Sequence, residues 1–408
     1  MSAKHALLFA YHFPPENAVG AARPYRFYRY LPQYGYQCHV ITAAEVATCP
    51  EFDAECVADP FLDSVGNGMG WQLERVVRKF LVPGAVGTQW AAAAYRAGQR
   101  FLDQHHGERV VVFSTYPPIG PHAAAWRLAR RYRLPWIADL RDPLAGNPAY
   151  AQLGFQTQLT YRLFERLSFG DARGVIANTD EAVRVLQQKY PSYSERFHLI
   201  WNGFDPEQRI EALPLASSEP RLLSHVGELY QGRTTAPLVE SFCRLVRSAR
   251  LRPDSFRLQL IGSADNSCMP PAEVTQAAQA EGWLQIVPRQ IPKSEALRLA
   301  QTSHYLLIVQ PQSAIQVPGK LFEYLQIGRP VLAFAPRGSS IERVLRPSGI
   351  PYVCVYPDMP PAALDDAIVS FFDIEPAVAK PSTWFEETFN AQSQTAALAK
   401  LMDALPAP

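Results

Sequence analysis

The feature that most constrains the fold is a repeated alternation of short apolar runs with longer segments of helical period. The apolar runs do not alternate with polar residues, which is typical of strands buried on both faces of a parallel sheet. In the first half of the chain they cover residues 6–11, 39–42, 109–115, 135–140, 174–179 and 197–202. In the second half they cover residues 221–227, 256–262, 284–289, 305–309, 330–336 and 352–356. Helical segments lie between them at 24–35, 122–133, 181–190, 237–250 and 293–303. The pattern predicts the α/β class, with a doubly wound parallel sheet in each half.

A polar, proline-bearing stretch without periodicity separates the two halves. It covers residues 206–220 and predicts a linker between an N-terminal domain at 1–205 and a C-terminal domain at 221–384. A chain of 408 residues is also too long for one ordinary core. A second irregular stretch, residues 45–70, is too long for a tight loop and predicts a surface excursion or lid.

Composition and charge exclude several classes of protein. The formal net charge is +1, from 39 basic and 38 acidic residues, so no attraction to nucleic acid is expected. The six cysteines form no C-x-x-C pair and no histidine cluster has ligand spacing, so no metal site is expected. The opening apolar run stops at His12 and Pro14, and no run approaches the roughly 18 apolar residues that span a bilayer. We therefore expect a cytoplasmic enzyme.

Small and polar residues gather where the predicted strands of the first domain end, which is where open parallel sheets bind ligands. Asn17, Val19 and Gly20 follow the first strand and precede a helix that carries Arg23. Small side chains at a helix start let backbone N–H groups approach an anion such as phosphate. The alternative is a plain turn with solvated arginines.

Two further groups follow later strands of the same domain. His122 starts a helix after the third strand, where it is either a ligand contact or a cap. Asp139, Arg141 and Asp142 leave the end of the next strand together. Three charges at one buried strand end are costly unless they meet a ligand or pair internally. Both readings stay open at this point.

In the second domain, Gly227 and Glu228 follow the first strand, and Arg233 precedes a helix. An arginine there can hold a phosphate through two parallel hydrogen bonds, although a surface arginine is the simpler interpretation. A later apolar stretch contains Pro318, Gly319, Lys320, Leu321 and Glu323.

The proline and glycine of that stretch suit the start of a helix, and Lys320 and Glu323 then share one face. A lysine beside a helix N-terminus suits a phosphate, and a carboxylate one turn deeper suits two sugar hydroxyls. The alternative is a surface salt bridge, which leaves unexplained why the pair lies in an apolar stretch.

In their order and spacing, several segments resemble the retaining glycosyltransferases of the family-4 type, also called glycosyl transferases group 1, which have the GT-B fold. The matching segments are FPPENAVGAARPYRFYRYLPQYGYQCHVIT, STYPPIGPHAAA, PWIADLRDP, GVIANTDEAVRVL, LIWNGFD, HVGELYQGR and VPGKLFEYLQIGRPVLA. The resemblance implies two Rossmann-like domains facing across a cleft, with the last helix, residues 385–408, packing back on the first domain. It also implies transfer of a sugar, with retention, from a UDP, GDP or dTDP sugar to an acceptor hydroxyl, without a metal or other cofactor.

Roles follow position by position from this resemblance. Glu323 would bind the ribose, Lys320 and Arg233 would neutralise the diphosphate, and His122 would contact the donor sugar. The catalytic residues would be His122, Asp142, Arg233 and Lys320. The donor-binding residues would be Gly20, Gly227, Glu228, Arg233, Pro318, Gly319, Lys320, Leu321 and Glu323. Asn17, Val19, Arg23, Asp139 and Arg141 would line the acceptor side of the cleft.

The chain departs from the family pattern in two places. Ile315 stands about where many relatives carry a first glutamate, and no lysine follows Arg233 at the usual short spacing. A catalytically impaired nucleotide-binding or scaffold protein of a polysaccharide pathway is therefore an alternative, and an epimerase of the same fold is another. The acceptor is a glycan, a lipid-linked saccharide or a small molecule. Arg75, Arg78 and Lys79, in the segment 71–101, suggest peripheral membrane contact, unless this segment simply packs on the core.

Overall fold

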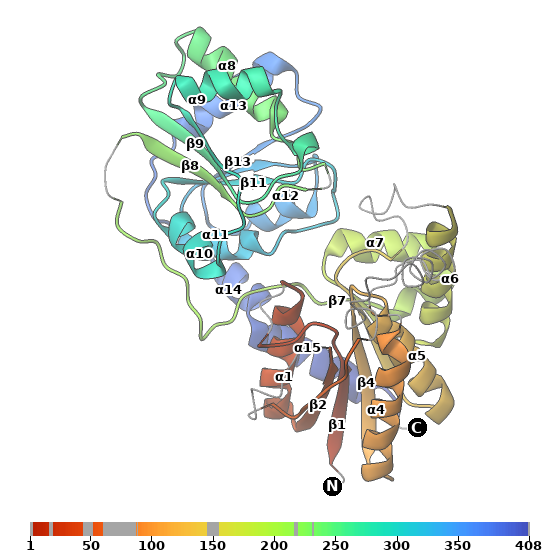
Figure 1. Cartoon of the computed structure of the whole chain (residues 1–408). Helices are drawn as coiled ribbons and strands as arrows, with labels where there is room; N and C mark the ends of the chain where they lie inside the picture. Colours follow the sequence, from red (N-terminus) through yellow and green to blue (C-terminus); the bar gives the residue numbers. More distant parts are fainter. Residues whose placement is uncertain are drawn as a thin grey trace. The chain divides into compact units, whose positions relative to one another are not determined.

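The computed structural model describes residues 3–15, 19–43, 52–59, 87, 89–144, 155–215, 219–230 and 232–406. The chain divides into two compact units, one made of Met1–Asn202 with Ala391–Pro408 and one made of Gly203–Asn390 (Figure 1). Asn17, most of the stretch 45–70, and Arg75, Arg78 and Lys79 lie outside the described residues.

The first unit is built on a parallel sheet with the strand order β3-β2-β1-β4-β5-β6-β7. Its strands are β1 (Lys4–Phe9), β2 (Tyr36–Thr42), β3 (Ala54–Cys56), β4 (Arg109–Tyr116), β5 (Trp136–Leu140), β6 (Gly174–Ala177) and β7 (Phe197–Leu199). The chain adds strands on one side of β1 and then on the other, starting with β4, so the switch point lies between β1 and β4. In the register, Phe9 pairs with Ser114 of β4 and with Ile41 of β2.

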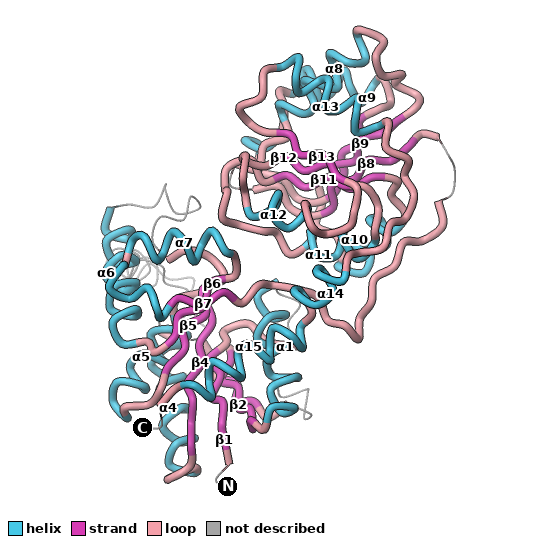
Figure 2. Tube along the Cα trace, turned by 180° about the vertical axis from the view of Figure 1, so that it is seen from behind, coloured by secondary structure: helices cyan, strands magenta, loops and turns pink. Residues whose placement is uncertain are grey.

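Helices cover both faces of this sheet, which explains why its strands are continuous apolar runs. They are α1 (Ala22–Tyr30), α4 (Trp90–Gln104), α5 (Gly120–Tyr132), α6 (Phe155–Asp171), α7 (Asp180–Lys189) and α15 (Ala391–Ala404). Leu8 of β1 packs in the cluster with Phe27 of α1 and Leu398 of α15, whereas Leu7 packs in the opposite cluster with Leu128 of α5. Figure 2 shows α1 and α15 side by side, although the whole second unit separates them in sequence.

Polar contacts fix α15 to the first unit. Asp403 accepts hydrogen bonds from Lys4 Nζ and Tyr36 Oη, both at 2.8 Å. Arg109 donates to the backbone oxygens of Met402 and Leu405, both at 3.0 Å. The end of the chain is therefore an integral layer of the first unit.

The second unit has a parallel sheet with the order β10-β9-β8-β11-β12-β13. Its strands are β8 (Arg221–Val226), β9 (Phe256–Ile261), β10 (Leu284–Val287), β11 (Tyr305–Val309), β12 (Val331–Phe334) and β13 (Tyr352–Val355). Its helices are α8 (Ala236–Arg247), α9 (Ala272–Ala280), α10 (Lys293–Gln301), α11 (Lys320–Ile327), α12 (Ser340–Leu345), α13 (Pro361–Phe372) and α14 (Thr383–Phe389). In Figures 1 and 2, α8, α9 and α13 lie on one face, and α10, α11 and α12 lie on the other.

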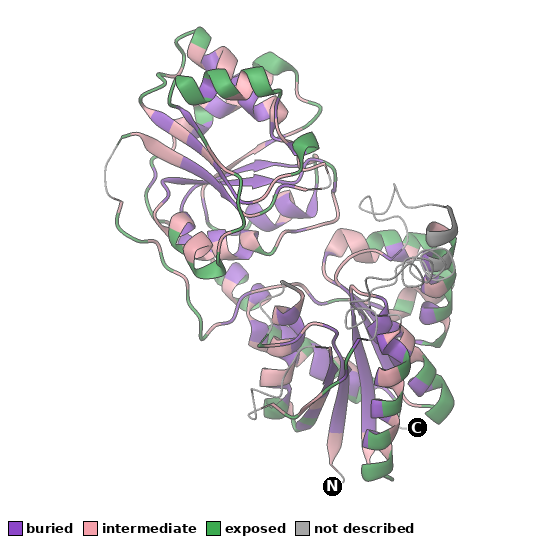
Figure 3. Cartoon of the chain, viewed as in Figure 1, coloured by how far each residue is buried: buried purple, intermediate pink, exposed green. Residues whose placement is uncertain are grey.

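Burial follows from these layers. Figure 3 shows the central strands of both sheets buried and the outer surfaces of the covering helices exposed. The two sheets therefore confirm the predicted α/β class of two doubly wound parallel domains.

The two chain segments at which the second unit begins and ends are paired. Phe204 N donates to Phe389 O at 2.9 Å, and the rings of Phe204 and Phe385 stack with centroids 5.3 Å apart. A Cβ added to Gly203 would overlap the carbonyl group of Phe389. Only a glycine therefore allows this close approach.

Candidate functional site

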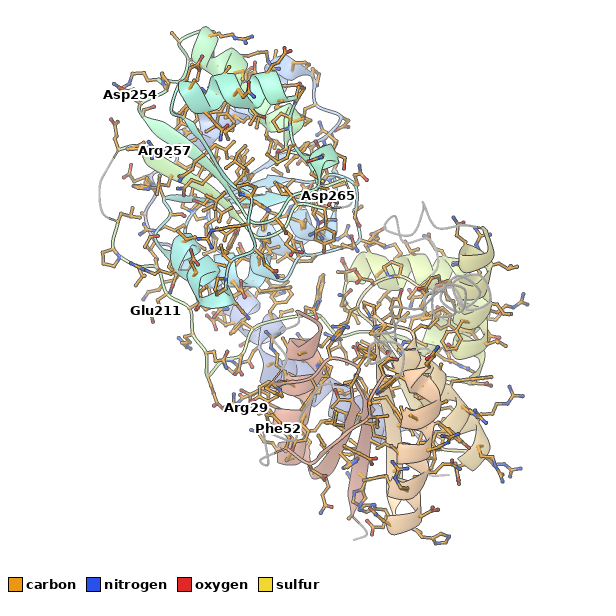
Figure 4. All side chains as sticks on the ribbon, viewed as in Figure 1. Arg29, Phe52, Glu211, Asp254, Arg257 and Asp265 are labelled. Carbon is orange, nitrogen blue, oxygen red and sulfur yellow. The ribbon has the colours of Figure 1, made fainter. Side chains whose placement is uncertain are left out.

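The unusual polar residues of the second unit gather at the switch point of its sheet. β8 and β11 are neighbours there, and the chain leaves β8 toward one side of the sheet and returns to β11 on the other. In Figure 4, Arg257 lies on β9 and Asp265 follows the carboxyl end of the same strand. Asp265 therefore marks the edge of the sheet at which the strands have their carboxyl ends. Open parallel sheets bind ligands at this edge.

Lys320 is the first residue of α11, and its side chain reaches across to the end of β8. Its Nζ lies 3.2 Å from Nε2 of His225. A Cβ added to Gly227 would stand 2.6 Å from the same Nζ, and Gly227 has φ +124°, so this position requires glycine for two reasons. Burial and the neighbouring Arg233 lower the pKa of Lys320 to about 7.

His225 is buried at 2% exposure, and sequence reasoning did not identify it. Its Nδ1 lies 3.0 Å from the carbonyl oxygen of Leu307 on β11. Because a carbonyl only accepts, Nδ1 carries the proton and Nε2 offers a lone pair to Lys320. Burial and the charge of Lys320 lower the pKa of His225 well below its usual value, so the ring is neutral. The one signal in the sequence was a histidine near the end of a predicted buried strand, two residues before Gly227.

Arg233 adds a second positive charge beside Lys320. Its guanidinium lies 4.1 Å from the ring centroid of Tyr230, a cation–π contact that orients the side chain. Gly232 precedes it with φ +78°, and a Cβ there would overlap the side chain of Gln312. Glu228 is exposed, and its charge acts on Lys320 from the same loop. Neither Lys320 nor Arg233 forms a salt bridge with a carboxylate in the described part of the chain.

Glu323 lies one turn into α11 and is 31% exposed at its side chain. Lys293 of α10 is its ion-pair partner, at 3.6 Å. A Cβ added to Gly319 would meet no atom within 4 Å, so packing within the protein does not explain the glycine.

The neighbours of these residues are placed differently. Pro318 is half-buried, and its carbonyl accepts the N–H of Leu321 at 3.0 Å. The side chain of Leu321 is fully buried and packs inside the unit. Ile315 is half-buried.

In the first unit, Arg141 connects the loops that follow three strands. It donates to Gly20 O at 2.7 Å, to Tyr116 O at 3.1 Å and to Pro117 O. A Cβ added to Gly20 would stand 2.8 Å from Nη1 of Arg141. The guanidinium of Arg141 thus fills part of the space beside Gly20 in which we expected a ligand. Val19 begins the short 3-10 turn Val19–Ala21 before α1.

Arg23 and Asp139 were expected to line the acceptor side of a cleft, and the structure instead buries both, at 5% and 0% exposure. Nε and Nη2 of Arg23 bind Asp139 at 2.8 to 3.1 Å, and Thr115 also donates to this carboxylate at 2.8 Å. Nη2 of Arg23 also donates to Ile200 O, and Nη1 donates to Trp201 O and Asn202 Oδ1. Because this set uses all five N–H donors, a ligand would have to break the pair to reach either side chain.

His122 is also fully buried, near the start of α5. Trp136 Nε1 donates to Ser114 Oγ at 2.8 Å, and Ser114 Oγ lies 2.8 Å from Nδ1 of His122. Since the indole only donates, the hydroxyl proton is left for Nδ1, and Nε2 of His122 carries the ring proton. No residue of the described chain accepts a hydrogen bond from this Nε2. Burial lowers the pKa of His122 to about 3, so it is a neutral donor near pH 7.

Asp142 is half-buried, and its charge acts on the guanidinium of Arg141. The structure thus brings the predicted residues together in two sets. Gly227, Glu228, Arg233, Lys320 and Glu323 belong to the second unit, and Gly20, Arg141, Asp142, His122 and the buried Arg23–Asp139 pair belong to the first.

The described residues contain neither a metal-binding cluster nor a membrane-spanning helix. Within the described ranges, no group of three or more His, Cys, Asp or Glu side chains is placed to hold a metal ion. None of the helices there is both long enough and apolar enough to cross a membrane.

Comparison with known proteins agrees with this architecture. Residues 22–208 match the model of Glycosyltransferase Family 4. The chain resembles HepE of Anabaena, solved with UDP and glucose, at 14% identity and a TM-score of 0.62, over 98% of this chain and 100% of the other. It also resembles the lipopolysaccharide outer core galactosyltransferase WaaB, at 11% identity and a TM-score of 0.55, over 98% and 99% of the two chains. No curated protein sequence matches.

The UDP-GlcNAc 2-epimerase of Methanocaldococcus jannaschii is similar as well, at 10% identity and a TM-score of 0.53, over 98% and 100% of the two chains. At these identities the likeness shows the fold alone. The two units have the GT-B fold. The predicted resemblance to family-4-type glycosyltransferases is confirmed by the family model over residues 22–208.

Proposed function

We propose that the protein transfers a sugar from a nucleotide-diphosphate sugar to an acceptor hydroxyl. The observation that carries this proposal is the pair Lys320 and Arg233, two cations at a sheet switch point that no carboxylate of the described residues neutralises. Among the described residues, the polar partner of Lys320 is the neutral ring of His225. A desolvated ammonium without a counter-ion is unfavourable, so the site favours an anion that supplies the missing charge.

A diphosphate fits this requirement in charge and position. Arg233 presents a planar fork for two phosphate oxygens, and Lys320 presents a compact charge at the start of α11, where the helix also favours anions. As the bond to the sugar breaks, negative charge grows on the departing phosphate, and fixed cations stabilise that charge. Because HepE, which this chain resembles, was solved with UDP and glucose, UDP-glucose is the first donor to test.

Each unit offers a further residue that we propose as a contact of the donor. Glu323, partly exposed one turn deeper in α11, accepts hydrogen bonds from the two ribose hydroxyls. His122, with a neutral Nε2–H that lacks an acceptor among the described residues, donates to a hydroxyl of the transferred sugar. The backbone at Gly319, beside which no atom lies within 4 Å of an added Cβ, leaves room for a phosphate.

The stereochemistry and the metal requirement belong to the same proposal. Asp139, the carboxylate whose charge acts on His122, is held by Arg23 and Thr115 and is not placed as a nucleophile. We therefore propose retention by front-face attack, in which the acceptor oxygen bonds to the anomeric carbon and its proton passes to the departing phosphate oxygen. The two cations replace a metal ion in charge stabilisation.

A thermal-shift screen across UDP, GDP and dTDP sugars tests the donor site, because a ligand that binds only the folded state raises the unfolding temperature. We expect one sugar nucleotide to stabilise the protein, and Lys320→Ala and Glu323→Ala to abolish the shift. An unchanged shift in both variants would show that the donor lies elsewhere.

Ile315 favours one alternative, a nucleotide-binding protein without transferase activity. Incubating the bound donor with glycan, lipid-linked and small-molecule acceptors separates the possibilities. A transferase forms a new glycoside, an epimerase releases an altered sugar without an acceptor, and a binding protein leaves the donor intact.

Co-sedimentation with anionic vesicles tests the proposed peripheral membrane contact.

A further inference from the structure

The buried histidine beside Lys320 makes polar contacts on two sides of its ring. His225 is the next-to-last residue of β8 and lies between the strands that flank the switch point. One ring nitrogen faces Leu307 O of the neighbouring strand β11 at 3.0 Å, and the other faces Lys320 Nζ at 3.2 Å. The ring therefore connects the sheet to the end of the Lys320 side chain.

We propose that His225 is a positioning residue of the diphosphate site, whose Nε2 lone pair holds the Lys320 ammonium against Gly227. The inference rests on the proposed function, because it assigns Lys320 to a diphosphate. A lysine side chain loses rotamer entropy when a ligand immobilises it, and a group that fixes it before binding removes part of that cost from ligand affinity.

The arrangement works only with one tautomer. The carbonyl of Leu307 accepts the Nδ1 proton, so Nε2 is the one nitrogen that can accept from Lys320. A protonated ring would present a second N–H to the ammonium and repel it. The sheet thus sets the orientation of the ring, and the ring sets the position of the ammonium.

Gly227 completes the arrangement from the other side. Any side chain there would occupy the place of Lys320 Nζ, since a Cβ would lie 2.6 Å from it. The ammonium is consequently held between the histidine ring and a bare stretch of backbone. The carboxylates whose charges act on it, Glu228 and Glu323, form no salt bridge with it.

Two substitutions of His225 separate positioning from a merely structural role. In His225→Asn the amide nitrogen occupies the place of Nδ1, so the bond to Leu307 O is retained while the acceptor for Lys320 is lost. In His225→Gln the longer side chain places an amide oxygen near the position of Nε2, so the acceptor is retained while the bond to Leu307 is lost.

His304 provides a matched control. It is buried at 4% exposure in the same unit, and its Nδ1 accepts the N–H of Leu222 at 3.1 Å at the opposite end of β8. His304→Asn therefore perturbs an equally buried histidine of the same sheet without touching the switch point.

The experiment titrates UDP-glucose, or whichever sugar nucleotide stabilises the wild type in the screen, into the full-length protein by calorimetry. The pH is kept below the pKa of about 7 of Lys320, so that its ammonium is charged before the donor binds. We expect His225→Asn to weaken binding about tenfold, as for the loss of a hydrogen bond to a charged group, while His225→Gln and His304→Asn stay within about threefold of wild type. Thermal unfolding of each variant confirms that it is folded.

The inference is overturned if His225→Asn binds the donor as tightly as wild type, or if His225→Gln is weakened more than His225→Asn. Either result would mean that the contact between His225 and Lys320 does not set the affinity for the donor. A wild-type protein that binds no sugar nucleotide would instead refute the proposed function, so the two failures are distinguishable.

Discussion

Donor binding should be coupled to the protonation of Lys320. Burial and Arg233 lower the pKa of its ammonium to about 7 in the free protein. Two adjacent phosphate charges favour the charged form and raise that pKa toward the ordinary value for lysine, so binding takes up a proton. Affinity is therefore highest below pH 7 and falls as the pH rises through the pKa of the free protein.

The magnitude follows from the size of the shift. If the pKa in the complex exceeds 10, the fraction of charged Lys320 in the free protein limits binding, and the dissociation constant rises about 50-fold between pH 7 and pH 9. Both phosphates of UDP-glucose stay ionised over this range. The other charged groups near Lys320 are Arg233, Glu228 and Glu323, with Lys293 beside the last.

The assay is calorimetric titration of UDP-glucose at several pH values, with Lys320→Arg as the control. Arginine stays charged throughout, so we expect its binding to be independent of pH over this interval. Two results would refute the assignment of the pH dependence to Lys320. One is a wild-type affinity that does not change with pH, and the other is a Lys320→Arg variant whose affinity falls with pH as in wild type.

Three further outcomes test other parts of the structure. Arg23→Met leaves Asp139 buried without its partner, and we expect a loss of about 3–5 kcal/mol in the free energy of unfolding, measured by urea denaturation. Gly203→Ala forces a methyl group into the carbonyl of Phe389, so the backbone must adopt a conformation that is absent from wild type. We expect the thermal unfolding temperature of this variant to be lower than that of wild type. His122→Phe keeps the volume of a buried ring and removes its N–H donor, so we expect turnover to fall about tenfold or more while its pH profile keeps the wild-type shape, because the pKa of His122 is about 3.

The sequence identified the architecture because periodicity is a local property. The continuous apolar runs correspond to strands such as β4 and β11, which lie between two helical layers. The start of α11 at Lys320 was also visible, because a proline and a glycine precede it. The strand β3 was not predicted, since its three residues, Ala54–Cys56, lie at the sheet edge and carry no apolar run.

The candidate site was harder to foresee because it depends on partners far apart in the chain. Arg23 looked like a free cation, and its partner Asp139 is separated from it by 116 residues. His225 looked like a core residue of β8, and its contact with Lys320 spans 95 residues. Contacts between residues so far apart in sequence cannot be predicted from local patterns, because they form only when parallel strands bring distant loops to the same edge of the sheet.

The most direct test of the proposed donor site compares two stacked arginines of the second unit. Arg233 lies over Tyr230, and Arg337 lies over Tyr356, each at 4.1 Å, but Arg337 also pairs with Asp358 at 3.2 Å, whereas Arg233 has no such carboxylate among the described residues. Both are replaced by methionine, and the affinity for the stabilising sugar nucleotide is measured by calorimetry. We expect Arg233→Met to weaken binding at least tenfold and Arg337→Met to leave it unchanged. Equal affinities in the two variants would contradict the claim that Arg233 and Lys320 form the diphosphate site.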